Sequence, residues 1–181
     1  MTIRLHGSHG RRTPAVCTST NYLRCANASA SGGRLSHVVD SDRVTRLLGA
    51  IDRDAGFLDT FGSSDPNDVL ANATSLAAIK YGFITATKGC ARVAHHICAS
   101  EGWKVGETSA DSIQMLSERG VISSDLAESL SRASGFRNVL VHQYIDNIDI
   151  DDVRAVENLN RIGDFRTFVA SVSAWIDRIE T

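Results

Sequence analysis

Apolar residues recur every three or four positions along most of the chain beyond residue 40, which is the spacing of one buried helical face. The first stripe follows Asp40 and Ser41, whose side chains are suited to cap the free amides of a first helical turn. Its apolar positions are Val44, Leu47, Leu48, Ile51, Ala55 and Leu58. A turn cluster at residues 62–66 follows. The pattern predicts a helix from Ser41 to about Phe61.

A second, longer helix is predicted from about Asn67 to Ser100. Its apolar positions spread broadly around the helix, which indicates burial on more than one side, in a bundle core or at a dimer interface. Gly82 and Gly89 lie within this surface, and each costs about 1 kcal/mol of helix stability against alanine. Either glycine is compatible with a bend or with the close approach of another helix.

Two shorter predicted helices follow a break at residues 101–106, where Gly102 is suited to end the long helix. The first of them covers residues 109–120. The second begins with Ser123 or Ser124 as its cap and runs into the segment around residue 140. This second helix carries the polar residues discussed below.

A final helix is predicted after the polar cluster at residues 149–152. Its buried stripe consists of Val153, Val156, Leu159, Ile162, Phe165, Phe168, Val169, Val172 and Ile176. The sequence contains neither the alternation typical of β-strands nor an internal repeat. The whole pattern predicts an all-α fold, an up-and-down helical bundle of about five helices.

The N-terminal segment differs from the rest of the chain. Residues 1–39 are rich in Ser, Thr, Gly, Ala and Arg and have no sustained apolar period. They also lack the apolar core of a secretory signal. A disordered tail, or a start site placed too early with Val38 or Val39 as the true start, is favoured over an organelle-targeting segment. The predicted organisation is a leader at residues 1–39 and a helical domain at residues 40–181.

Composition and charge limit the classes of function. The 181 residues are 43% hydrophobic and include only two prolines, as suits one domain of long helices. No apolar run is long enough for a membrane span, so we expect a cytoplasmic protein. The leader holds five arginines and no acid, which leaves 14 basic against 21 acidic residues beyond position 39, a net charge of −7. A general nucleic-acid binder is therefore disfavoured, and any RNA must be bound locally or by two subunits together.

Candidate metal ligands are few and poorly spaced. The cysteines are Cys17, Cys25, Cys90 and Cys98. They form no Cys-x-x-Cys pair, and the last two are best interpreted as small buried hydrophobes with reduced thiols. His95 and His96 point about 100° apart on a helix, and Glu101 is poorly spaced to join them. We expect no metal and no other cofactor.

The segment Gly135–Ile145 places Arg137, Asn138, His142 and Tyr144 within an otherwise apolar stretch. The pattern Arg-x-x-x-x-His-x-Tyr, with a polar residue directly after the arginine, resembles the HEPN superfamily. It is most similar to the HepT-like toxins, whose partner is a small MntA-type nucleotidyltransferase antitoxin. The predicted order of a long second helix, a short third and a motif-bearing fourth extends this resemblance over residues 40–181.

The resemblance implies a metal-independent endoribonuclease toxin. It also implies that the antitoxin silences the toxin by transferring AMP from ATP to Tyr144. Families of this kind often carry acidic residues in the second helix, where this chain has Lys88 and Arg92. The role of the second helix is therefore open.

The motif makes chemical sense for RNA cleavage. On a helix, Arg137 and Tyr144 lie about 20° apart, while Asn138 and His142 form a second ridge about 100–140° away. His142 is suited to exchange protons with the ribose 2′-hydroxyl or the leaving oxygen, and Arg137 to hold the phosphate oxygens. Asn138 is suited to orient the phosphate or the imidazole. Because only RNA has the 2′-hydroxyl, the expected substrate is RNA rather than DNA.

A homodimer with two such helices facing each other would gather these groups around one phosphodiester. Two alternatives stay open. The arginine and histidine are also compatible with local capping or pairing, and Tyr144 with an ordinary half-buried tyrosine. The acidic domain also fits a non-catalytic helical subunit that binds a nucleotidyltransferase.

Overall fold

The computed structural model describes residues 39–142 and 148–181, so residues 1–38 and Tyr144 lie outside the described ranges, as does the side chain of His142. The described part contains helices and no strand, which confirms the predicted all-α fold. The helices are α1 (Ser41–Asp59), α2 (Pro66–Ala71), α3 (Ala73–Ser100), α4 (Ser109–Glu118), α5 (Ser124–His142), α6 (Ile148–Glu157), the short 3-10 helix η1 (Asn158–Arg161) and α7 (Ile162–Ile179).

Helix α1 begins where the sequence predicts. The side chain of Asp40 accepts a hydrogen bond from the Arg43 amide at 2.9 Å, and so caps the first turn. Of the six predicted stripe positions, Leu47 is half-buried and the other five are buried. This apolar face packs along α3 and α7. The periodicity of the first stripe therefore predicted both the helix and the side that it buries.

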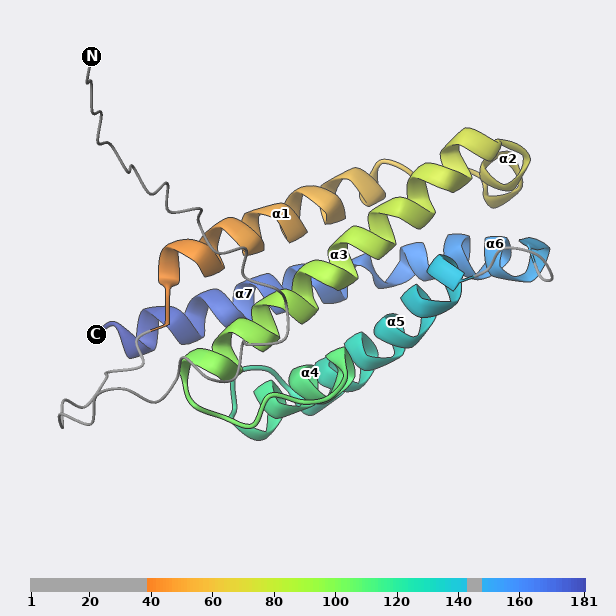
Figure 1. Ribbon diagram of the computed structural model, residues 1–181. Helices are drawn as coiled ribbons and strands as arrows, with labels where there is room; N and C mark the ends of the chain where they lie inside the picture. The colour runs from red at the N-terminus through yellow and green to blue at the C-terminus, as the bar shows by residue number, and fades with distance from the viewer. Residues whose placement is uncertain (1–38, 143–147) are drawn as a thin grey trace, which may run out of the picture. The chain divides into compact units, whose positions relative to one another are not determined.

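Helix α3 is the central element of the bundle. It packs against α1, α4, α5 and α7, which confirms the burial on more than one side that its broad apolar surface predicts. The long helices α1, α3, α5 and α7 run up and down alongside one another (Figure 1). None of the helices in the described ranges combines the length and the apolar character that a membrane crossing requires.

The glycines of α3 mark close helix approaches rather than bends. A Cβ atom at Gly89 would lie 2.6 Å from Ile51 Cγ1, and one at Gly82 would lie 2.8 Å from Leu58 Cδ2. Distances this short are too close for non-bonded carbon atoms. The two glycines therefore allow α1 to pack directly on the α3 backbone.

Two of the predicted helices are divided in the structure. The second is interrupted at Asn72, whose backbone is extended and whose side-chain oxygen caps α3 by accepting hydrogen bonds from the Thr74 and Ser75 amides. The last is divided into α6, η1 and α7. As a result Val153, predicted to be buried, is 43% exposed. The described residues therefore hold more helical segments than the roughly five predicted, because Asn72 caps α3 within the second predicted helix and η1 interrupts the last one without a side-chain cap.

Candidate functional site

Helix α5 positions the motif residues. Its first turn is capped by the Ser123 hydroxyl, which accepts a hydrogen bond from the Leu126 amide at 3.3 Å. The N-terminal half of α5 is anchored in the core by Leu126 and Leu130. Towards the other end, Arg137 is half-buried and Asn138 is exposed. The helix is thus fixed at one end while its motif-bearing end reaches the surface.

The first two motif residues contact each other. Arg137 Nη1 donates a hydrogen bond to Asn138 Oδ1 at 2.9 Å. This contact limits the positions available to the guanidinium, whose other N–H groups stay available to a ligand. His142 is the last residue of α5, and its side chain and Tyr144 lie outside the described residues. The structure therefore brings Arg137 and Asn138 together and leaves the other two positions as predictions.

A pocket of about 450 Å³ opens beside Arg137, between α5, α3 and the start of α4. Its lining includes the side chains of Lys88, Arg92, His95 and Arg137 and, among the residues that the structure describes, no aspartate or glutamate. We call it the basic pocket. Neither Lys88 nor Arg92 forms an ion pair with a carboxylate in the described ranges. A positive field in a concave site attracts anions, and phosphates in particular.

Three buried polar atoms in the basic pocket have no hydrogen-bond partner among the described residues. They are His95 Nε2, Ser134 Oγ and Arg137 Nε. A buried polar atom without a partner is costly, of order 1–3 kcal/mol, so such atoms are rare in folded proteins. All three belong to residues that line one cavity, so the layer directly beneath its surface is polar.

The wall of the basic pocket at α4 is held by a reciprocal cap. Thr108 Oγ1 accepts a hydrogen bond from the Asp111 amide at 3.1 Å, and the Asp111 carboxylate accepts one from the Thr108 amide at 2.9 Å. The hydrogen bonds from Thr108 lower the pKa of the Asp111 carboxyl. Thr108 itself lines the pocket, so the cap holds part of its wall in place.

The structure gives the other candidate ligands a packing role. Within the described ranges, no group of three or more His, Cys, Asp or Glu side chains lies close enough together to hold a metal ion. Cys90 and Cys98 are buried, as predicted, and burial raises the pKa of both thiols. A thiol with a raised pKa is a poor nucleophile at neutral pH. The two cysteines therefore pack as small hydrophobes.

His95 and Ser134 were not predicted as site residues, and Lys88 and Arg92 had no predicted role. Lys88, Arg92 and His95 come from α3, far from the motif in sequence, whereas Ser134 lies on α5 itself, close before Arg137. One signal was available, because residues 88, 92 and 95 fall within about 60° of one another on a helix. That face is basic throughout. Only the packing of α3 on α5 shows that it meets Arg137.

The bundle, with a basic pocket at its motif-bearing helix, defines a class of small all-α proteins suited to binding a phosphate-containing ligand. Residues 51–172 match the family model described as ribonuclease HepT-like. The chain therefore belongs to the HepT-like ribonuclease family, which confirms the resemblance drawn from the motif.

Known relatives agree with this assignment. The mRNA nuclease HepT of Shewanella oneidensis is 30% identical over 88 residues, which span 48% of this chain and 64% of that protein. The fold also matches a solved structure of a tri-AMPylated Shewanella oneidensis HEPN toxin in complex with an MNT antitoxin. That match has a TM-score of 0.65 and 22% identity, and covers 74% of this chain and 98% of that one.

A second solved structure shows how widely the fold occurs. YutE of Bacillus subtilis, a cytosolic protein of unknown function, has a TM-score of 0.65 with 13% identity, and the match covers 77% of this chain and 92% of YutE. At such identities the likeness concerns the fold alone.

Proposed function

We propose that the chain is a metal-independent endoribonuclease, the toxin of a toxin–antitoxin pair that acts in the cytoplasm. The observation that carries the proposal is the contact of Arg137 with Asn138 beside the acid-free basic pocket, on the helix that ends at His142. Family membership supports it. So do the activity of the Shewanella oneidensis relative as an mRNA nuclease and the complex of the related HEPN toxin with its antitoxin.

The negative net charge of the domain does not exclude RNA binding at the basic pocket. Lys88 and Arg92 would hold RNA phosphates beside Arg137, because the pocket gathers positive side chains although the domain as a whole is negative. RNA binding then depends on a local field. Single-stranded RNA is the expected form, because its backbone can enter a pocket of this size.

The proposed reaction needs only the ribose and acid–base groups. The 2′-oxygen attacks the adjacent phosphorus while the bond from phosphorus to the 5′-oxygen breaks, which leaves a 2′,3′-cyclic phosphate and a 5′-hydroxyl. His142 would take the proton of the 2′-hydroxyl or, when protonated, supply one to the leaving oxygen. Arg137 would stabilise the charge that grows on the non-bridging oxygens, with Asn138 orienting the phosphate or the imidazole.

A homodimer would complete this site, because each α5 supplies only one proposed acid–base histidine and one motif arginine. Two facing copies would provide a base on one side of the phosphodiester and an acid on the other. Sedimentation of the purified chain at micromolar concentration should therefore give a dimer. A strictly monomeric species that still cleaves RNA would show that one copy suffices.

The proposed control of the toxin is AMP transfer from ATP to Tyr144 by a nucleotidyltransferase antitoxin. The tri-AMPylated state of the related Shewanella oneidensis toxin supports this step. A nucleotide attached next to the motif would add negative charge and bulk, and both would repel RNA from the basic pocket. The partner expected in the cell is thus a small nucleotidyltransferase.

Incubation of the purified chain with total RNA tests the proposal. The wild-type chain should fragment the RNA without added metal, and His142→Ala should not. Arg178→Ala is a suitable control, because Arg178 lies on α7 and lines neither the basic pocket nor the cavity described below. Intact RNA with every variant, together with tight binding to the nucleotidyltransferase, would instead establish a non-catalytic binding subunit.

A further inference from the structure

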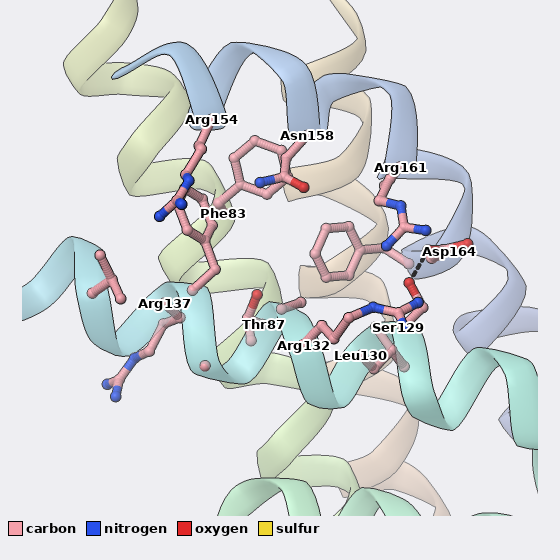
Figure 2. A pocket seen from close by; sticks show the side chains of 15 residues that line it. Phe83, Thr87, Ser129, Leu130, Arg132, Arg137, Arg154, Asn158, Arg161 and Asp164 are labelled. Carbon is pink, nitrogen blue, oxygen red and sulfur yellow. Dashed lines mark hydrogen bonds between the residues drawn. The ribbon is translucent and has the colours of Figure 1, made fainter. Parts of the chain in front are cut away.

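A second cavity lies on the opposite side of α5 from the basic pocket. It has a volume of about 480 Å³ and is enclosed by α3, α5, α6, η1 and α7 (Figure 2). Its apolar lining is dominated by Phe83, Leu130, Phe136 and Phe165. Small-molecule sites in proteins typically have about 300–1,000 Å³ and a mostly apolar lining, so both its size and its lining suit a ligand.

Three arginines surround the apolar lining, and we call this cavity the arginine pocket. Arg132 comes from α5, Arg154 from α6 and Arg161 from η1, while Arg137 points away from them (Figure 2). Arg132 pairs with Glu128, and Arg154 lies 3.6 Å from Asp151. Arg161 has no carboxylate partner within the described residues. The side chains of Arg132 and Arg154 are more than half exposed. Their ion pairs with Glu128 and Asp151 are therefore weak, and a ligand can replace them.

Two further polar groups line the arginine pocket. Thr87, on α3, is only 3% exposed, so its hydroxyl belongs to the interior wall. The Asn158 amide comes from η1 and offers both a donor and an acceptor. Ser129, by contrast, already donates to Asp164. The Thr87 hydroxyl and the Asn158 amide are therefore the polar groups that we expect to form hydrogen bonds with the edge of a flat ligand.

We propose that the arginine pocket is a nucleotide subsite, in which an unstacked base enters the phenylalanine-lined cavity and its phosphate is held by an arginine at the edge of the cavity, where Arg154 and Arg161 stand at opposite ends (Figure 2). One guanidinium group can donate two parallel hydrogen bonds to the oxygens of a phosphate, and bases stack favourably on aromatic rings. A purely apolar ligand would leave Arg161 without a partner, and an inorganic anion would leave the apolar cavity unfilled. A nucleotide satisfies both halves of the pocket.

The position of the subsite links it to RNA cleavage, and this link rests on the proposed function. Thr87, Gly135 and Arg137 line both pockets, so the two cavities meet at α5. A nucleotide in the arginine pocket would therefore adjoin the phosphodiester held at Arg137. The subsite would select which base stands next to the bond that is cut, with Thr87 and Asn158 reading its edge.

Binding of mononucleotides tests the subsite without cleavage, because a mononucleotide has no phosphodiester to cut. The full chain is titrated by calorimetry with AMP, GMP, CMP, UMP and inorganic phosphate. At least one nucleotide should bind about tenfold more tightly than phosphate, because the base adds apolar contact. The double variant Arg154→Ala/Arg161→Ala should weaken that binding by about tenfold or more, while Arg178→Ala should not change it. Equal affinity in the wild type and the double variant, or no nucleotide binding, overturns the proposal.

Cleavage of short RNAs that differ in one base tests the link. The double variant should raise KM and flatten the base preference, with kcat nearly unchanged. The slope of the logarithm of the RNA affinity against the logarithm of the salt concentration should become shallower by about 0.7 for each lost phosphate contact. Thr87→Val should alter the base preference and leave the affinity for phosphate as it is. Circular dichroism confirms that each variant is folded.

The outcomes separate the subsite from the proposed function. Nucleotide binding by a chain that cuts no RNA would contradict the ribonuclease and leave a site for free nucleotides. Cleavage without nucleotide binding or base preference would contradict the subsite alone. If the double variant loses only its binding to the nucleotidyltransferase, the pocket is a protein-docking surface and the proposal is wrong.

Discussion

The two pockets on either side of α5 share a helix and a positive charge, but they differ in what lies beneath that charge. The basic pocket presents buried polar atoms without partners and no acid. The arginine pocket presents aromatic rings under side chains that partly pair with carboxylates. Arg137 and Arg132 are five residues apart, hence about 140° around the helix, so Arg137 lies where the two pockets meet while Arg132 lines the arginine pocket and not the basic pocket. Positive charge alone therefore does not define a site, because the groups below it decide whether phosphate chemistry or base recognition is favoured.

The comparison also explains how an acidic domain can serve RNA. The net charge of −7 beyond residue 39 averages over the surface, whereas the described residues that line the basic pocket include no acidic side chain. The field near a ligand depends mainly on charges within about 8–10 Å at physiological salt. Local composition therefore outweighs the net charge.

We expect the largest effect on kcat in a comparison of alanine variants at Arg137 and Arg132, both on α5. Arg137→Ala should lower kcat for RNA cleavage by about 10²–10³, the usual cost of removing a group that stabilises transition-state charge. Arg132→Ala should leave kcat nearly unchanged, because that side chain faces the other cavity. Single-turnover cleavage with melting curves measures both, and each variant should keep its stability within about 0.5 kcal/mol. Equal losses in kcat would remove the distinction between the two sides of α5.

A smaller effect is expected from the two neighbouring histidines of α3. His95→Phe should lower kcat/KM by about tenfold, because it removes a polar ring from the lining of the basic pocket. His96→Phe is the matched control, since His96 lines neither cavity. Steady-state cleavage assays give the ratio. If His96→Phe costs as much, the basic pocket is not where α3 meets RNA.

The cap of α4 should affect one pocket and spare the other. Thr108→Ala should lower the free energy of unfolding by about 1 kcal/mol at pH 7 and weaken RNA binding, but leave mononucleotide binding unchanged. The Asp111 carboxyl has a lowered pKa in the folded state, so its contribution is present above the unfolded pKa and is lost as pH falls through the folded value. Because Thr108→Ala keeps the backbone amide that donates to this carboxylate, the pH dependence is tested with Asp111→Asn, whose difference from the wild type in urea unfolding should become smaller below about pH 4. A pH-independent difference would argue against the Asp111 contact.

The smallest expected effect on cleavage is that of Tyr144→Phe. The phenol is proposed as the acceptor of AMP and not as a group in the reaction, so the rate should stay near that of the wild type. With ATP and the nucleotidyltransferase, mass spectrometry should detect AMP on the wild-type chain and none at this position in the variant. A variant that no longer cleaves RNA would place the hydroxyl in the chemistry.

Much of the fold follows from local rules. The stripe of α1, its Asp40 cap and the positive φ of Gly102 after α3 were all expected from sequence. The breaks at Asn72 and at η1 were not, because the apolar period continues through both, although the Asn72 side chain caps α3 and the backbone tightens into a 3-10 turn at η1. Gly82 and Gly89 could not be interpreted from sequence either, since a glycine within a helix is compatible with a bend and with a close approach until the partner helix is known.

The sequence by itself determined the helical class, the family and the position of Arg137 and Asn138 on one helix, because these depend on spacing along a single segment. Only the tertiary structure decided that Lys88, Arg92 and His95 meet Arg137, and that a phenylalanine-lined cavity lies behind the same helix. Both cavities are made of residues tens of positions apart in the chain. Their chemistry arises from how α3, α5 and α7 pack, which no local pattern specifies.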